Sequence, residues 1–160
     1  MQRHEYGSVF LPVIDCIKNN FTNAIISRCS EIGCRLRLNG LSKCVVLKGE
    51  RICQGRKICD CIIFTEGTII GIVELKSRTT HSHEIVEKLT NGSEIALNIL
   101  DECSNNGTKF EFYHLVLAKK WHSSEYKVIT SRKIVVRGER YHVIPKRCGI
   151  SFSAIISGFK

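Results

Sequence analysis

Two short apolar runs separated by three residues constrain the fold of this chain more than any other feature. The runs span residues 59–64 and 68–73, and Thr65, Glu66 and Gly67 lie between them. Both runs are rich in β-branched residues and the break contains a glycine, which predicts a β-hairpin rather than one continuous helix. Apolar residues hardly alternate with polar ones in either run. We therefore expect both faces of the hairpin to be covered.

Charged residues lie at the ends of these apolar runs: Asp60 in the first, and Glu74 and Lys76 after the second. Residues two apart on a strand share a face, so Glu74 and Lys76 are predicted to point one way, with Val73 and Leu75 on the other face. The turn brings Asp60 alongside them. Charges in such apolar surroundings are costly to desolvate without partners. A divalent cation bound by the two carboxylates, with the lysine beside a metal-bound water, would offset that cost and could hydrolyse a phosphodiester.

The arrangement of Asp60, Glu74 and Lys76 resembles the PD-(D/E)xK nuclease superfamily, in which an aspartate and a Glu-x-Lys motif lie on adjacent strands. The continuation through Ser77 and Arg78 is similar to the archaeal Holliday junction resolvase branch. The resemblance implies an α/β fold with a restriction-endonuclease-like α-β-β-β-α-β core, a mixed sheet flanked by helices, and a basic C-terminal extension. The order of expected elements fits this core over residues 9–117.

The resemblance also implies roles for individual residues. Asp60 and Glu74 would bind Mg²⁺ or Mn²⁺ together with the backbone carbonyl of Leu75. Lys76 would orient or deprotonate the attacking water and stabilise charge on the phosphorane. The structural alternative is a core hairpin in which Glu74 and Lys76 form a salt bridge with each other.

Many relatives place a further acidic metal ligand on the helix that precedes the sheet. Glu31 is the candidate for that position here, and Asp15 and Glu50 are alternatives. For each of them a surface carboxylate without a metal role is the other interpretation.

The charge of the chain indicates a polyanionic partner, which we expect to be DNA. The net charge is +9 and the isoelectric point is near 9.2. A membrane surface would also fit that charge, but no apolar run approaches the about 18 residues of a membrane-spanning helix. The nucleic-acid-binding candidates are basic residues around Asp60 and Lys76, namely Arg51, Arg56, Lys57 and Arg78. The N-terminus lacks the features of a secretion signal, so a cytoplasmic location is expected.

A single domain of 160 residues is expected. The predicted elements are a helix over residues 8–31, a strand over 41–47, a basic loop over 48–57, a helix over 84–103 with a break or kink at Asn91-Gly92, a strand over 110–117, and short strands over 127–130, 134–136 and 141–144.

The nine cysteines include no Cys-x-x-Cys pair, which argues against a zinc ribbon or a redox dithiol. Most follow the apolar pattern and are expected to be buried as small hydrophobic residues. One or two disulfides are expected if the source is a hyperthermophile, and a cluster on four cysteines is a further alternative.

The hypothesis is therefore a metal-dependent DNA endonuclease, and a homodimer if it is a junction resolvase. A restriction-type or mobile-element-type nuclease is equally open. No Gln-x-x-x-Tyr occurs within residues 84–103, which disfavours the recombination exonucleases of the superfamily. The competing class is a non-catalytic nucleic-acid-binding module on the same fold.

Overall fold

A mixed sheet forms the centre of the molecule. The computed structural model describes residues 10–76, 81–104 and 107–158. Within these ranges a seven-stranded sheet has the order β1-β4-β5-β6-β7-β9-β8, and a separate two-stranded sheet pairs β2 with β3. The strands are β1 (Ile25–Ile26), β2 (Cys29–Glu31), β3 (Cys34–Leu36), β4 (Cys44–Lys48), β5 (Cys61–Thr65), β6 (Ile69–Lys76), β7 (Glu111–Ala118), β8 (Lys133–Val136) and β9 (Glu139–Arg147).

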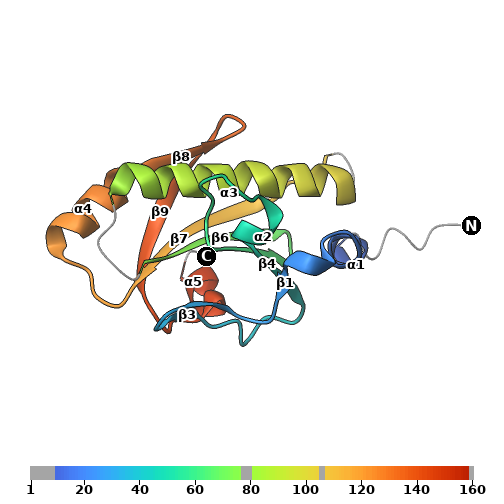
Figure 1. Ribbon diagram of the computed structural model, residues 1–160, viewed down its shortest axis with the longest axis horizontal. Helices are drawn as coiled ribbons and strands as arrows, with labels where there is room; N and C mark the ends of the chain where they lie inside the picture. Colours follow the sequence, from blue (N-terminus) through green and yellow to red (C-terminus); the bar gives the residue numbers. More distant parts are fainter. Residues whose placement is uncertain (1–9, 77–80, 105–106, 159–160) are drawn as a thin grey trace, which may run out of the picture.

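Helices cover both faces of this sheet (Figure 1). The helices are α1 (Phe10–Asn20), the short 3₁₀ helix η2 (Thr22–Ala24), α2 (Gly49–Ile52), α3 (Ser82–Cys103), α4 (Ser123–Ser131) and α5 (Phe152–Ser157). Residues of α1, α3 and α4 pack with one face of the sheet in one hydrophobic cluster. Residues of α5 and of the β2–β3 pair pack with the opposite face in a second cluster. The α/β fold with a mixed, helix-flanked sheet is confirmed.

The predicted hairpin is confirmed as β5 and β6, which pair antiparallel with Cys61 opposite Val73 and Phe64 opposite Ile70. The chain then crosses over through α3 and returns as β7, which lies parallel to β6. β6 is therefore a central strand with covered faces, as its almost uninterrupted apolar sequence indicated.

Helix α3 continues through Asn91-Gly92, so the break expected there is wrong. A Cβ atom on Gly92 would lie 2.4 Å from Cys59 Sγ and 3.1 Å from Ile72 Cγ2. Glycine is needed at this position because the helix approaches the sheet too closely for any side chain. The Asn91 side chain donates a hydrogen bond to the Lys57 carbonyl at 2.7 Å, which ties the helix to the loop before β5.

The expected helix over residues 8–31 is wrong in its second half. Helix α1 ends at Asn20, and the Thr22 hydroxyl donates to the Lys18 carbonyl at 3.1 Å. Such side-chain bonds to the backbone compete with helix continuation. The chain then forms β1, where Ile25 pairs with Leu47, and Glu31 belongs to β2 rather than to a helix.

The strand predicted over residues 127–130 is also wrong, because these residues lie in helix α4. Their β-branched composition favours a strand, but Ile129 of this helix packs into the main core, and packing of this kind overrides local propensity. Strands β8 and β9 are present near the predicted positions. β9 is parallel to β7, so the basic C-terminal part extends the sheet itself.

Three disulfide bonds join distant parts of the described chain. They are Cys16–Cys103, Cys29–Cys61 and Cys34–Cys148, and Cys44, Cys53 and Cys59 are free. The bridges connect α1 to the end of α3, β2 to β5, and β3 to the residue after β9. Disulfides are typical of oxidising compartments and of intracellular proteins of hyperthermophiles. The cytoplasmic location stays a prediction. Within the described residues no helix has the length and apolarity needed to cross a membrane.

Candidate functional site

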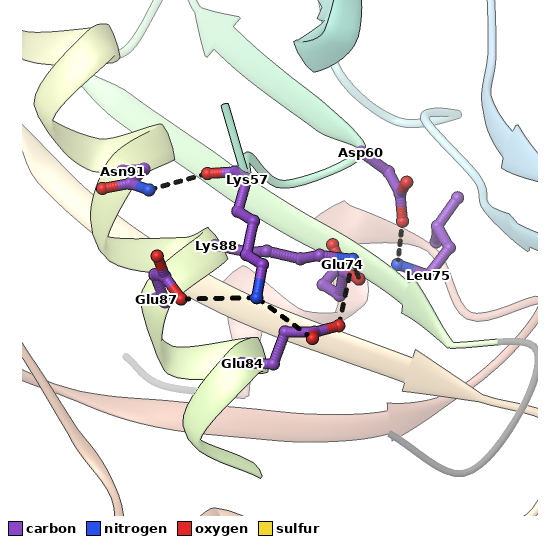
Figure 2. A network of polar contacts seen from close by, with 8 residues as sticks. All are labelled: Lys57, Asp60, Glu74, Leu75, Glu84, Glu87, Lys88 and Asn91. Atoms are coloured by element: carbon purple, nitrogen blue, oxygen red, sulfur yellow. Dashed lines mark hydrogen bonds and ion pairs between the residues drawn. The ribbon is translucent and has the colours of Figure 1, made fainter. Parts of the chain in front are cut away.

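The site lies where β6 ends and β5 begins. Asp60 immediately precedes β5, and the pairing of Cys61 with Val73 places Asp60 beside the position of Glu74. The Leu75 backbone N–H donates to Asp60 Oδ2 at 2.7 Å, so the aspartate is attached to the strand that contains Glu74 (Figure 2). The sequence-based placement of Asp60 next to Glu74 and Leu75 is confirmed.

The two charged residues of β6 share a face, as predicted. Glu74 contacts Lys88 of α3 and Lys76 contacts Glu125 of α4, so both lie on the face of the sheet that α3 and α4 cover. Val73 and Leu75 belong to the hydrophobic cluster on the opposite side of the sheet.

Glu74 is a buried carboxylate, only 6% exposed. Its Oε2 accepts from Lys88 Nζ at 3.1 Å, whereas among the described residues its Oε1 has no hydrogen-bond partner. Burial and, after it, repulsion from Asp60 raise the pKa of Glu74 to about 7, while Lys88 acts in the opposite direction. Among the described residues, the site therefore contains an acceptor oxygen with no hydrogen-bond partner and a Glu74 charge that Lys88 compensates only in part.

Asp60 is affected by the same causes. Burial raises its pKa, the Leu75 N–H lowers it, the nearby Glu31 raises it, and Lys88 and Lys48 lower it. Glu31 in turn lies 3.7 Å from Lys48 Nζ. Although its predicted helix is absent, Glu31 is thus close enough to the carboxylate pair to act on it.

The other acidic candidates are less closely connected. Asp15 is exposed on α1, and Glu50 is exposed on α2, where the sequence predicted only a loop. Neither is among the main causes of the raised pKa values of Asp60 and Glu74.

Lys76 does not pair with Glu74. Its Nζ lies 2.9 Å from Glu125 Oε2 and 5.3 Å from the centroid of the Trp121 ring, and its side chain is 6% exposed. The core salt bridge between Glu74 and Lys76 is therefore not the arrangement that the structure contains. Each of these two residues has a different partner on a different helix.

A charged network continues from Glu74 along α3 (Figure 2). Lys88 lies 4.0 Å from Glu84, and Lys57 lies 3.4 Å from Glu84 and 3.9 Å from Glu87. Sequence reasoning missed Lys88 as a site residue. Its signal was the position four residues after Glu84, the spacing of an ion pair on a helix surface.

The predicted DNA-binding residues differ in their availability. Arg51 on α2 and Arg56 in the following loop are exposed. Lys57 is 53% exposed, but its ammonium is engaged with two glutamates of α3. Arg78 lies outside the described residues.

The residues present fit a divalent cation. Carboxylate and carbonyl oxygens are the ligands that Mg²⁺ and Mn²⁺ prefer. Asp60 and Glu74 are adjacent, and a residue on a strand directs its N–H and C=O to the same neighbour, so the Leu75 carbonyl is on the Asp60 side. Glu74 Oε1 is a buried oxygen still in need of a partner. Among the described side chains, no group of three or more His, Cys, Asp or Glu residues is arranged to hold a metal by itself.

The chain matches no protein-family model, none of the curated proteins and no solved structure.

Proposed function

We propose that this chain is a metal-dependent endonuclease that hydrolyses DNA phosphodiester bonds. The observation that supports the proposal most directly is the carboxylate pair of Asp60 and Glu74 on neighbouring strands, with Glu74 Oε1 buried and without a hydrogen-bond partner among the described residues. A buried Glu74 carboxylate beside the half-buried Asp60 carboxylate is unfavourable without added positive charge. A bound divalent cation would supply that positive charge, whereas a purely structural hairpin does not require two adjacent carboxylates.

Asp60, Glu74 and the Leu75 carbonyl would hold Mg²⁺ or Mn²⁺, and Glu31 is the nearby acidic residue for a further ligand. When bound, the cation would supply Lewis-acid polarisation of the phosphate and a water of lowered pKa. Lys88 neutralises part of the charge on Glu74 in the structure as it stands.

Lys76 is the residue proposed to orient the attacking water and to donate to the negatively charged phosphate oxygens. Glu125 holds its ammonium at 2.9 Å, and the Trp121 ring lies beside it, so the lysine has a fixed position two residues beyond Glu74. Fixed charges aimed at the reacting group lower the barrier because they need no reorganisation during the reaction.

Arg51 and Arg56 are exposed on the segment that leads to Asp60 and are proposed to contact the DNA backbone, with Lys57 in a lesser role. Phosphate contacts of this type position a duplex without reading its sequence. A homodimer that resolves four-way junctions and a restriction-type or mobile-element-type nuclease are both compatible with these residues.

The second candidate is a non-catalytic nucleic-acid-binding module on the same fold. It is favoured by one observation: the ammonium groups of Lys76 and Lys88 already have carboxylate partners within the protein. In such a module these ion pairs would only stabilise the fold, and the basic surface alone would bind DNA.

Incubation with a four-way junction, a duplex and a single strand, each with Mg²⁺, Mn²⁺ or EDTA, separates the two candidates. The nuclease should cleave at least one of these substrates with a metal and none in EDTA. Asp60→Asn and Glu74→Gln should abolish cleavage while the protein stays folded and still binds DNA, because each removes a charged ligand without changing volume.

Glu102→Gln is the matched control, since Glu102 is an exposed carboxylate at the far end of α3. It should cleave at the wild-type rate. A wild-type protein that binds these DNAs but cleaves none of them with either metal would support the binding module. Cleavage at the full rate by Glu74→Gln would contradict the assignment of Glu74 to the active site.

A further inference from the structure

A pocket lies next to Lys76. Its volume is about 240 Å³, and its walls include Lys76, Trp121, Glu125, Ile85, Val128 and Ile129. It lies between the first turns of α3, the helix α4 and the end of β6. The pocket is smaller than the about 300–1,000 Å³ typical of sites for drug-sized ligands, so it suits a single ring system.

We propose that this pocket binds one unpaired nucleobase of the DNA substrate, stacked against Trp121. The proposal rests on the nuclease function above and adds to it the preferred substrate class, a strand with at least one base outside a duplex at the site of cleavage. Stacking on an aromatic side chain is the usual way in which proteins bind unpaired bases.

The chemistry of the walls matches a base better than it matches a purely apolar ligand. Ile85, Val128 and Ile129 provide apolar surface, while the ion pair of Lys76 and Glu125 provides a donor next to an acceptor. Lys76 Nζ donates to Oε2 of Glu125. The carboxylate can accept further hydrogen bonds, and the ammonium has further protons to donate. Glu125 can thus accept from an exocyclic amino group while Lys76 donates to a ring nitrogen or carbonyl oxygen.

Cytosine, adenine and guanine offer an exocyclic amino group with two protons beside an acceptor, whereas thymine offers only its single ring N3–H beside a carbonyl oxygen. We therefore expect bases with an amino group to bind more tightly than thymine.

The position of the pocket relative to the carboxylates is also suitable. Glu74 and Lys76 are two residues apart on β6, which corresponds to about 6.6 Å along a strand. A nucleotide whose phosphate is at Asp60 and Glu74 would have its own base, or that of its neighbour, within reach of the pocket. Lys76 borders both places and would connect base binding to the reacting phosphate.

Trp121 provides a direct readout because it is the only tryptophan in the sequence. We would titrate the full chain, in EDTA, with short abasic strands that have one base at the central sugar, either cytosine or thymine, and with the fully abasic strand. The cytosine strand should quench tryptophan fluorescence and bind roughly tenfold more tightly than the fully abasic strand. The affinity of the strand with thymine should lie between the affinities of the cytosine strand and the fully abasic strand.

Val128→Glu tests the location. Val128 is 44% exposed on a wall of the pocket, so the added carboxylate should repel the strand and prevent the base-dependent quench without disturbing the core. Val135→Glu is the matched control, because Val135 is 49% exposed on β8 and does not line the pocket. It should keep the quench and the preference for a base.

Equal quenching and equal affinity for the cytosine strand and the fully abasic strand would overturn the proposal, as would an unchanged base preference in Val128→Glu. Because the readout is binding in EDTA, it does not depend on cleavage. A base-dependent quench in a protein that never cleaves DNA would support base binding in the pocket and contradict the nuclease function. Cleavage without any base preference would support the nuclease function and contradict base binding in the pocket.

Discussion

The ammonium of Lys88 lies 3.1 Å from Oε2 of Glu74, which connects helix α3 to the centre of the sheet at the end of β6. Lys88 and Lys48 offset the charge of Asp60 and Glu74 only in part, and the pKa values of both carboxyl groups are raised. The protein thus holds a partly compensated acidic pair in its interior. This imbalance leads to predictions that do not require the substrate to be known.

Replacement of Lys88 by methionine should destabilise the protein in a pH-dependent way. At pH 8 Glu74 is ionised and would lose its partner, and we expect a loss of about 2 kcal/mol, below the 3–5 kcal/mol of fully buried pairs because the Lys88 side chain is 26% exposed. At pH 5 Glu74 binds a proton and the loss should be smaller. Urea unfolding at the two pH values measures it, with the exposed Lys109→Met as control. An equal loss at both pH values would contradict this charge pairing.

The unfolding free energy of the wild type should fall as the pH rises from about 4.5 to 7. Glu74 has an ordinary pKa of 4.5 and a pKa of about 7 in the folded protein, so in this range the folded state binds the proton that the unfolded state has lost. The fall should be on the order of 3 kcal/mol. Asp60 shifts in the same direction, and Lys88 titrates well above this range. Glu74→Gln should flatten the profile measured by urea unfolding.

Addition of Mg²⁺ or Mn²⁺ provides the complementary test of the same carboxylates. A ligand that binds only the folded state raises its stability, and here the effect should be larger at pH 8, where Glu74 is ionised, than at pH 5. Thermal melts with each cation and with EDTA at the two pH values measure this. Asp60→Asn should remove the effect, and a cation shift that persists in this variant would place the binding elsewhere.

Lys76→Ala should separate the enzyme from the binding module. On the proposed mechanism the single-turnover cleavage rate falls by orders of magnitude, whereas DNA affinity falls far less, because Lys76 acts mainly in the transition state and its contact with the base is one of several. The loss of stability should be modest, since the Glu125 side chain left behind is 21% exposed. Glu125→Gln is informative beside it, because it keeps the ammonium and removes its charged partner. A rate that survives Lys76→Ala would exclude the lysine from the reaction.

The basic segment before Asp60 should contribute unequally to DNA binding. Removal of Arg51 or Arg56 should each reduce the slope of log affinity against log salt by roughly one, the value for a lost phosphate contact. Removal of Lys57 should change it less, because its ammonium is held by Glu84 and Glu87. Metal-free binding over a range of salt concentrations decides this. Identical slopes for all three variants and the wild type would move the contact surface to another face.

Features set by residues close together in the sequence could be predicted, and features set by residues far apart in the sequence could not. The β5–β6 hairpin, the crossover helix and the shared face of Glu74 and Lys76 follow from local composition and from the two-residue period of a strand. These were predicted correctly for that reason. The adjacency of Asp60 and Glu74 followed from the hairpin itself.

The partners of the charged residues could not be predicted in the same way. Glu125 is 49 residues from Lys76 along the chain, and it lies in α4, just before the residues 127–130 that were predicted as a strand. Lys88 reaches Glu74 only because α3 packs closely on the sheet. Packing between distant elements selects these pairs, and no local pattern contains that information.

The close approach at Gly92 makes the charge balance of the site depend on a residue without a side chain. A methyl group there would meet the Cys59 sulfur at 2.4 Å and would push α3 away from β6. Lys88 lies one helical turn before Gly92, so its distance from Glu74 would grow with that displacement. The glycine thus fixes the distance between α3 and the sheet, and that distance sets how much of the negative charge at Asp60 and Glu74 Lys88 neutralises.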